Sequence, residues 1–305
     1  MNPNYPVYII SKGRWEDRLR LTDKYLGAMN VPHYIVVEEQ EYEAYRAHVS
    51  DLATLLILDP KYQDEYDTCD DLGNTKSKGP GPARNFVWDH SIAQGAKWHW
   101  VMDDNIRGFY RLNHNRRIPV GDGTMFYAME EFVERYENIG MAGPHYLSFS
   151  PARTKLPPFI INRRIYSCNL IRNDMPYRWR GRYNEDTDLS LRMLKDHHCT
   201  VIFYAFLQNK VNTQSLRGGN TQEFYNAEGT MPKSKMQVDL HPDISRLVWR
   251  YERWHHDVDY SGFRQRLRRK PDVEIPKGTN EYGMVYQRKI NDKWITQPTD
   301  KVVNP

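Results

Sequence analysis

Two adjacent carboxylates at the end of an apolar run are the residues of this sequence best suited to chemistry. Residues Trp98–Met102 predict a buried strand, and Asp103, Asp104 and Asn105 follow it directly. Open α/β sheets bind their ligands at the carboxyl ends of the strands. Paired oxygen ligands in that position suit Mg²⁺ or Mn²⁺ bridging a diphosphate, so Asp103 and Asp104 are candidate metal ligands. A solvated acidic turn after a strand is the alternative interpretation.

A second group of acids begins the segment Glu185–His197, whose apolar residues have the spacing of a helix. Glu185, Asp186 and Asp188 fall in its first turn, and Asn184 can cap it. The helix dipole favours acids here, so ordinary capping explains part of the pattern. The same field favours a carboxylate at Asp186, or else at Glu185, that accepts a proton from an acceptor hydroxyl as a general base.

Basic residues stand beside turns that can approach a phosphate. The Gly- and Pro-rich turn Lys78–Pro82 leads into a helix that carries Arg84 near its start. Arg84 can pair with a phosphate or hold the first acid that follows the apolar strand. Ser11, Lys12 and Arg14 follow the first predicted strand and allow the same two readings, a nucleotide contact or a polar turn.

The elements that must position these residues alternate between strands and helices. Such alternation predicts an α/β fold with a mostly parallel central sheet flanked by helices. The predicted strands are Pro6–Ser11, His33–Val37, Thr54–Leu58, Trp98–Met102 and Val201–Phe206, with shorter ones within Met141–Phe149 and Phe159–Arg172. The predicted helices are Arg18–Ala28, a segment ending at Arg46, Ala83–Gln94, Met125–Tyr136 and Glu185–His197. Residues Lys61–Lys78 and Asn113–Gly123 are expected to be loops, and Gln208–Lys235 a long loop that can act as a lid.

The composition indicates a globular protein with a strongly solvated surface. Of the 305 residues, 39% are hydrophobic and 27% are charged. No stretch reaches the roughly 18 apolar residues of a membrane span, and the first residues lack the pattern of a signal peptide. The three cysteines are widely spaced, which argues against disulfides and a thiolate zinc site. We therefore expect a cytoplasmic protein with no membrane partner.

Residues 236–305 predict an extension to a main domain of residues 1–235. The segment Arg246–Lys270 contains eight Lys or Arg residues against three acids, although the whole chain carries a net charge of only +4. Cations alternate with aromatic residues there, Arg250 and Trp254 among them, as on surfaces that contact phosphates and stack on bases. An amphipathic helix packed by its aromatic residues is the alternative. We expect a basic, aromatic and helical extension, and a hairpin or poorly ordered tail over Asn280–Pro305.

The motifs occur in an order that resembles the GT-A glycosyltransferases. They are Ser11–Arg14, Gly81–Asn85, Asp103–Asn105 and Asn184–Arg192, and the resemblance covers residues 5–207. It implies a Rossmann-like GT-A fold in which the acids after the fourth strand bind metal and ribose and a later Glu-Asp pair contains the catalytic base. Asn105 stands where many relatives have Asp, which makes Asp104 the main expected ligand and His241 a candidate helper.

More narrowly, the chain resembles the phage-type TET-associated glycosyltransferases. These are implied to glycosylate hydroxymethylated pyrimidines, such as 5-hydroxymethylcytosine, in DNA. The resemblance implies Mn²⁺ or Mg²⁺, a nucleotide-sugar donor that is usually a UDP-sugar, a DNA acceptor, an inverting transfer and, for a phage protein, the cytoplasm of the bacterial host. The donor is expected to contact Ser11, Lys12, Arg14, Glu38, Lys78, Arg84 and Asp103. The acceptor is expected to contact Tyr177, Trp179, Tyr183, Arg250 and Trp254, the first three walling a pocket for an extruded base.

Two other functions fit parts of the same pattern. A glycosyltransferase that acts on a small molecule, a glycan or a protein hydroxyl needs the same donor site but no DNA surface. A nucleic-acid-binding protein with an inactive transferase fold needs the basic surface but no chemistry. Steep salt dependence of acceptor binding would favour DNA over a small acceptor, because phosphate contacts release counterions.

Overall fold

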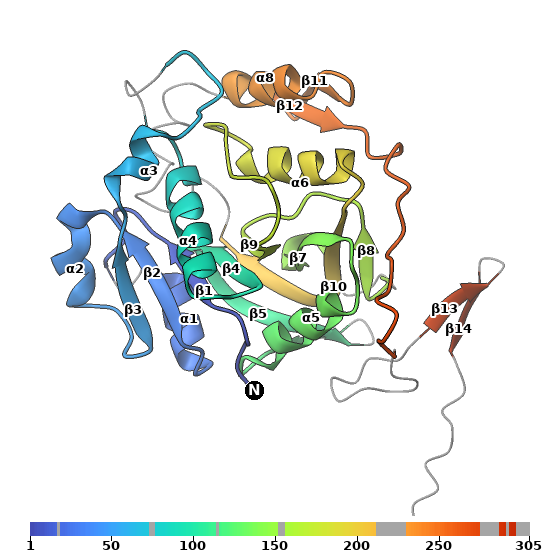
Figure 1. Ribbon diagram of the computed structural model, residues 1–305, viewed down its shortest axis with the longest axis horizontal. Coiled ribbons are helices and arrows are strands. Elements are labelled where there is room, and N and C mark those ends of the chain that lie inside the picture. Colours follow the sequence, from blue (N-terminus) through green and yellow to red (C-terminus); the bar gives the residue numbers. More distant parts are fainter. Residues whose placement is uncertain are drawn as a thin grey trace, which may run out of the picture.

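The computed structural model describes residues 1–16, 19–72, 77–113, 116–151, 156–211, 230–274, 287–290 and 293–296. Its largest element is a sheet that runs through the centre of the molecule (Figure 1). The strands of this sheet are β1 (Val7–Ile10), β2 (His33–Val37), β3 (Ala53–Ile57), β4 (Trp98–Asp103), β5 (Ile106–Asn113), β6 (Arg116–Pro119), β7 (Ile139–Tyr146), β8 (Phe159–Ile161), β9 (Cys168–Arg172) and β10 (Cys199–Lys210).

Helices surround the sheet, and two small hairpins follow it in the chain. The helices are α1 (Leu21–Ala28), α2 (Tyr42–Arg46), α3 (Pro60–Asp64), α4 (Gly81–Ala93), α5 (Thr124–Glu134), α6 (Glu185–Lys195) and α8 (Met231–Leu240), with the short 3₁₀ turns η1 (Glu39–Glu41) and η3 (Leu147–Phe149). The hairpins are β11 (Ser245–Arg250) with β12 (Arg253–Val258), and β13 (Gln287–Ile290) with β14 (Lys293–Thr296).

The sheet is largely parallel, as the alternation of elements predicts. Its order is β3-β2-β1-β4-β9-β7-β10-β5-β6, and β8 pairs with β10 beside this path. Strands β3, β2, β1 and β4 are parallel neighbours, and β7 and β10 run the same way because antiparallel β9 lies between β4 and β7. The carboxyl ends of β1, β2, β4, β7 and β10 therefore lie at one edge.

Alternation along each strand divides the core into two layers. Val7 and Ile9 of β1 belong to a cluster with α1 and α5, whereas Tyr8 and Ile10 belong to a cluster with α4 and α6. Successive side chains of a strand point to opposite faces, so a strand that is apolar throughout must be covered on both faces. All four residues of β1 are buried. This arrangement places the starts of α4 and α6 on one side of the sheet.

Three expectations about individual segments need correction. The expected loop Asn113–Gly123 contains β6, which pairs with the end of β5. The expected loop Lys61–Lys78 overlaps α3, because Asp59 caps a helix whose first residue is Pro60. Most of the expected lid, residues 212–229, lies outside the described residues, and its ends belong to β10 and α8.

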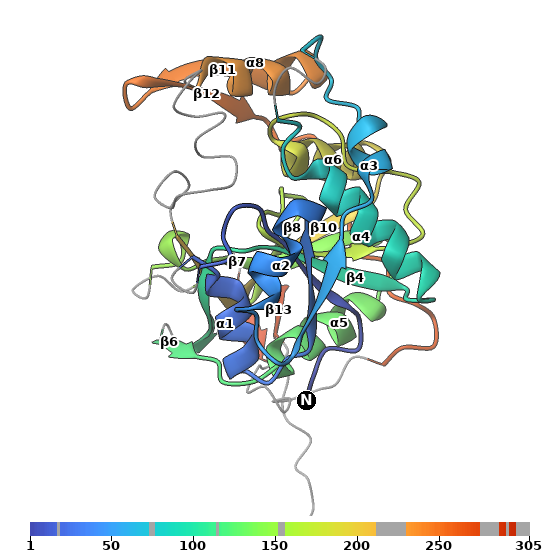
Figure 2. The ribbon, with the colours of Figure 1, turned by 90° about the vertical axis from the view of Figure 1, so that its left-hand side faces the viewer.

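The basic, aromatic segment after α8 is a β-hairpin and not a helix. Trp249 faces Trp254 across β11 and β12, with ring centroids 5.3 Å apart. The turn residues Tyr251 and Glu252 both have positive φ, as in the two-residue turns that match strand twist. Figures 1 and 2 show α8 and this hairpin as a layer on top of α6. The predicted C-terminal hairpin is present as β13 and β14.

Among the described residues no helix is long and apolar enough to cross a membrane.

Candidate active site

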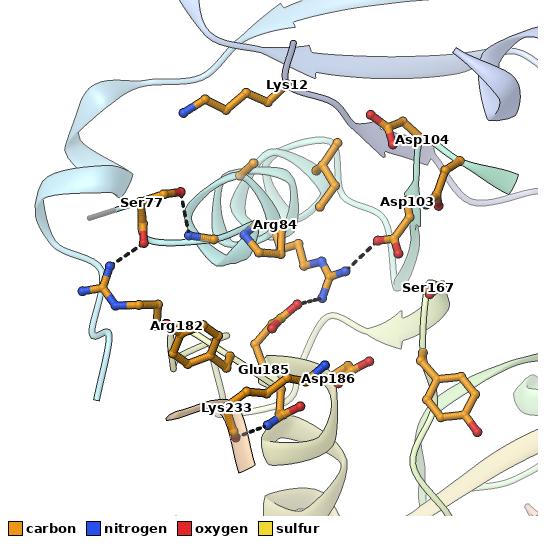
Figure 3. A pocket seen from close by; sticks show the side chains of 18 of the residues that line it. Lys12, Ser77, Arg84, Asp103, Asp104, Ser167, Arg182, Glu185, Asp186 and Lys233 are labelled. Carbon is orange, nitrogen blue, oxygen red and sulfur yellow. Dashed lines mark hydrogen bonds and ion pairs between the residues drawn. The ribbon is translucent and has the colours of Figure 1, made fainter. Parts of the chain in front are cut away.

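The strand ends and two helix starts meet around one large cleft. It has a volume of about 1190 Å³ and is lined by residues that follow β1, β2, β4, β7 and β10 and by the first turns of α4 and α6. Both acids at the end of β4, Asp103 and Asp104, and both acids at the start of α6 line it, so Asp104 and Asp186 share one cavity (Figure 3). The two acidic segments that the sequence predicts to cooperate are thus brought together.

Asp103 lies between two cations. Its Oδ1 accepts a hydrogen bond from Arg84 Nη2 at 2.9 Å, and its Oδ2 accepts one from Lys210 Nζ at 2.5 Å. Burial alone would raise the pKa of Asp103, but Lys210 and Arg84 together hold it below its usual value. Lys210 also donates to Ser167 Oγ at 2.8 Å, which fixes the ammonium at the end of β10.

Asp104 is held on the other side of the strand by the segment after β1. It forms an ion pair with Arg14, and its Oδ2 accepts from Ser11 Oγ at 2.6 Å. Burial raises the pKa of Asp104 in spite of these partners. Tyr45 Oη lies 2.7 Å from Ser11 Oγ and accepts from the Arg14 backbone N–H at 3.0 Å, so α2 braces the same turn.

The two acids at the start of α6 have different surroundings. Glu185 Oε1 accepts from Arg84 Nη1 at 2.8 Å, so Arg84 bridges Asp103 and Glu185. Burial raises the pKa of Glu185, and Arg84 only partly offsets it. Asp186 is half-buried, lines the cleft, and its Oδ1 accepts from the Thr187 N–H at 2.7 Å. No Lys or Arg among the described residues forms an ion pair with Asp186. Its carboxylate is therefore the one best placed to take a proton.

The starts of α4 and α6 are tied to each other by Tyr66. The Tyr66 hydroxyl donates to the carbonyl oxygen of Gly181 at 2.8 Å, and its ring fills the space that a side chain at Gly81 would need. Asn184 precedes α6 but does not cap it through its side chain, contrary to expectation. It adopts a left-handed conformation, and its amide donates to the Lys233 carbonyl at 2.7 Å, which ties α6 to α8.

The family model of the TET-associated glycosyltransferases matches residues 5–219. The chain belongs to this family. It is therefore a glycosyltransferase, and the family name supports a role in DNA modification. The match covers the sheet, the cleft acids and α6, and it ends before α8 and the β11–β12 hairpin. Comparison with curated proteins gave no significant match.

The donor residues expected for this TET-associated glycosyltransferase line the cleft. Ser11, Lys12, Arg14, Glu38, Lys78, Arg84 and Asp103 are all found there. Glu38 pairs with Lys12 at 3.1 Å and accepts from Gln63 Nε2 at 3.0 Å. Apolar residues of the same region, including Val36 and Leu58, give this end of the cleft the mixed lining of a nucleotide pocket.

Only some of the expected acceptor residues line the cleft. Tyr183 and Trp254 line the cleft, but Tyr177, Trp179 and Arg250 do not. Tyr177 and Trp179 are buried in the core under α4 and α6, where Trp179 supports the guanidinium of Arg84, 4.6 Å from its ring. Aromatic residues near an acidic motif can pack behind the site as easily as within it, and sequence spacing does not distinguish the two.

Several cleft residues of the glycosyltransferase had not been predicted. Lys210, Ser167, Arg164 and Tyr166 line the cleft together with His256. Arg164 stacks on Tyr166 at 4.8 Å and donates to His256 Nε2 at 3.4 Å. Burial and Arg164 lower the pKa of His256 to about 3, so its imidazole is neutral. Lys210 ends β10, which runs four residues beyond the predicted strand Val201–Phe206, so Lys210 falls within the expected lid.

The acids at the end of β4 do not fit a divalent-metal site as they lie. Each carboxylate oxygen of Asp103 and Asp104 already accepts from a cation or a hydroxyl. The Asn105 Oδ1 is buried without a partner, but one neutral oxygen is a weak basis for binding Mg²⁺ or Mn²⁺. His241 lies outside the cleft, where its Nε2 meets Asp188 Oδ1 at 2.9 Å. The described residues contain no group of three or more candidate metal ligands.

Proposed function

We propose that the protein transfers a sugar from a nucleotide-sugar donor, with a uridine nucleotide as the first candidate, to the hydroxymethyl group of a modified pyrimidine in DNA. The observation that carries this proposal is the shared cleft of Asp104 and Asp186 in a chain of this family. The strand order and the position of the acids support a GT-A type of fold.

The proposed donor end is the part of the cleft between β1, β2 and α4. Arg14, Lys12 and Arg84 supply cationic groups for the diphosphate there, and Arg side chains pair well with phosphate oxygens. Asp103 pairs with Arg84, and Ser11 donates to Asp104, the partner of Arg14. The N-terminus of α4 adds a partial positive charge that favours an anion.

The proposed catalytic base is Asp186. Its oxygen would take the proton of the acceptor hydroxyl while that hydroxyl attacks the anomeric carbon from the face opposite the leaving diphosphate, which inverts the configuration. Glu185 is held by Arg84 and keeps that guanidinium in place. Arg84 therefore connects Asp103, at the proposed donor end, with Glu185 of α6.

The proposed acceptor end lies beneath the β11–β12 hairpin. Trp254 and His256 reach the cleft from β12, and Tyr166 and Arg164 reach it from the segment before β9. Aromatic rings and a guanidinium can stack on an extruded base and pair with its phosphate. A base in duplex DNA has to leave the stack to reach Asp186.

The test is incubation of 5-hydroxymethylcytosine DNA with a panel of UDP-hexoses, followed by mass spectrometry of the nucleosides. A hexose-sized gain on the modified base, absent with unmodified DNA, is the expected result. Hexose transfer to a small alcohol or a peptide, with none to DNA, would establish the alternative acceptor class. Donor that stays intact with every acceptor and with water would favour a binding protein with an inactive transferase fold.

A further inference from the structure

One carboxylate holds two cations side by side at the centre of the cleft. Asp103 accepts from Arg84 on one oxygen and from Lys210 on the other. The Arg84 and Lys210 side chains are only 4% and 15% exposed, so both charges are well shielded from solvent. Charges in such a site act more strongly on a bound anion than charges in water.

Lys210 has donor capacity left for a ligand. An ammonium carries three N–H donors, and the described contacts of Lys210 use one for Asp103 and one for Ser167. Ser167 Oγ also lies 2.7 Å from Tyr146 Oη, so the group that orients Lys210 is itself fixed. The remaining N–H can donate to an oxygen in the cleft without breaking either contact.

The charge of the cleft is that of an anion site and not of an empty cation site. Among the described residues, nine Lys or Arg side chains and six carboxylates line it, an excess of three positive charges. A site that waits for a divalent cation instead presents carboxylates in excess of cations. Here the four carboxylate oxygens of Asp103 and Asp104 are occupied by Arg14, Ser11, Arg84 and Lys210.

We propose that Lys210, together with Arg84, supplies the positive charge that stabilises the departing nucleoside diphosphate, so that glycosyl transfer needs no divalent cation. This inference rests on the proposed function. The bond between the anomeric carbon and the diphosphate oxygen breaks, and its electron pair stays on the diphosphate. The acceptor oxygen bonds to the anomeric carbon and its proton goes to Asp186. Lys210 remains protonated and donates a hydrogen bond to the diphosphate.

The first test measures nucleotide binding with and without metal. Calorimetry with UDP, and with CDP, GDP and ADP as further probes, is carried out in EDTA and again with MgCl₂. We expect a diphosphate to bind equally well in both solutions. Electron paramagnetic resonance is recorded for Mn²⁺ with that nucleotide, first without the protein and then with it. We expect the two Mn²⁺ spectra to be the same. Binding or transfer that is lost in EDTA and restored by Mn²⁺ would overturn the inference but leave the proposed transfer standing.

The second test compares Lys210→Met with Lys210→Arg. Loss of a charged hydrogen bond should weaken diphosphate binding by about tenfold or more, leave binding of uridine unchanged, and slow transfer. The arginine variant should recover much of the diphosphate affinity because it keeps the charge. Uridine affinity and melting temperature report whether Lys210→Met is folded. Unchanged diphosphate affinity in the folded methionine variant would overturn the inference, and no diphosphate binding by the unaltered protein would overturn the proposed function as well.

Discussion

The four acids Asp103, Asp104, Glu185 and Asp186 of the cleft differ in the side chains that contact them. Asp103, Asp104 and Glu185 are each held by an Arg or Lys, and these pairs fix cations where a diphosphate can bind. Asp186 faces the cleft with backbone and hydroxyl donors from Thr187 as its contacts. The oxygens that Arg14, Arg84 and Lys210 occupy are not available to an acceptor hydroxyl, whereas the Asp186 carboxylate lines the cleft without a direct ion pair among the described residues.

Asp186→Asn should therefore lower kcat by about 10²- to 10⁴-fold and leave donor affinity nearly unchanged. The amide keeps the size of the side chain but cannot accept the proton. Steady-state kinetics and nucleotide calorimetry measure the two effects separately.

Glu185→Gln is the matched comparison for Asp186→Asn. It weakens the contact with Arg84, so its larger effect should fall on donor affinity. If Asp186→Asn turned over at nearly the normal rate, the base would have to be another residue.

At the scale of elements, α6 is anchored from below by the sheet and from above by α8. Asp188 of α6 is fully buried and accepts from Arg180 and Arg192 and meets His241 just after α8. Burial opposes ionisation of this acid, but His241, Arg180 and Arg192 lower its pKa to about 2. The contact that places His241 away from the cleft thus ties α6 to the segment just after α8.

The stabilisation by Asp188 should disappear in acid. Because its pKa is lower in the folded protein than the ordinary value of 3.8, its contribution is complete above that value and is lost as the pH falls to about 2. The difference corresponds to about 2 kcal/mol. Urea unfolding of the unaltered protein and Asp188→Asn, from neutral pH downward, measures it.

The Asp188→Asn variant itself should be less stable at neutral pH by about 2 kcal/mol, because it removes the buried carboxylate that Arg180 and Arg192 share. Its free energy of unfolding should also vary less with pH in the acid range than that of the unaltered protein. Parallel curves for the two proteins would show that Asp188 is not the group responsible.

The β11–β12 hairpin offers a matched pair of arginines for testing the acceptor surface. Arg250 and Arg253 face each other across the two strands, but only Arg253 lines the cleft within the described part of the chain. Arg253→Ala should weaken use of the DNA acceptor and reduce the salt slope by about one, whereas Arg250→Ala should change both much less. Acceptor kinetics at several salt concentrations measure this. Equal effects of the two variants would mean that DNA crosses the outside of the hairpin.

At the scale of the molecule, the positive charge is concentrated around the cleft and in the segment after α8. The net charge of the chain is +4, and Arg246–Lys270 alone holds eight Lys or Arg residues against three acids. The main domain of residues 1–235 and the extension of residues 236–305 remain our proposed division of the chain. We propose that residues 1–235 bind the donor and that residues 236–305 cover the acceptor.

Transfer to DNA should consequently fall steeply with salt, whereas hydrolysis of the donor in the absence of DNA should change little. Counterions are released when Lys and Arg contact DNA phosphates, and the contribution of this release to binding becomes smaller as the salt concentration rises. Comparing kcat/KM for transfer with the rate of donor hydrolysis over the same salt series separates the acceptor surface from the donor site. Identical salt slopes would argue against an extended DNA surface.

The sequence alone determined the α/β fold and the acids of the cleft. Local rules suffice for these features: strand periodicity, the Gly-Pro turn before α4, and acids placed at a strand end and a helix start. Asp103 and Asp104 could be chosen because parallel strands bring their carboxyl ends to one edge of a sheet, and Glu185 and Asp186 because they begin a helix.

Only the tertiary structure decided which groups surround those acids. Lys210 reaches Asp103 because antiparallel β9 lies between β4 and β7, which brings the end of β10 beside the acid pair. His241 and Trp179 support the site from behind, and the basic segment forms a hairpin over it. Such contacts join residues far apart in the chain, and their geometry depends on packing that local patterns do not encode.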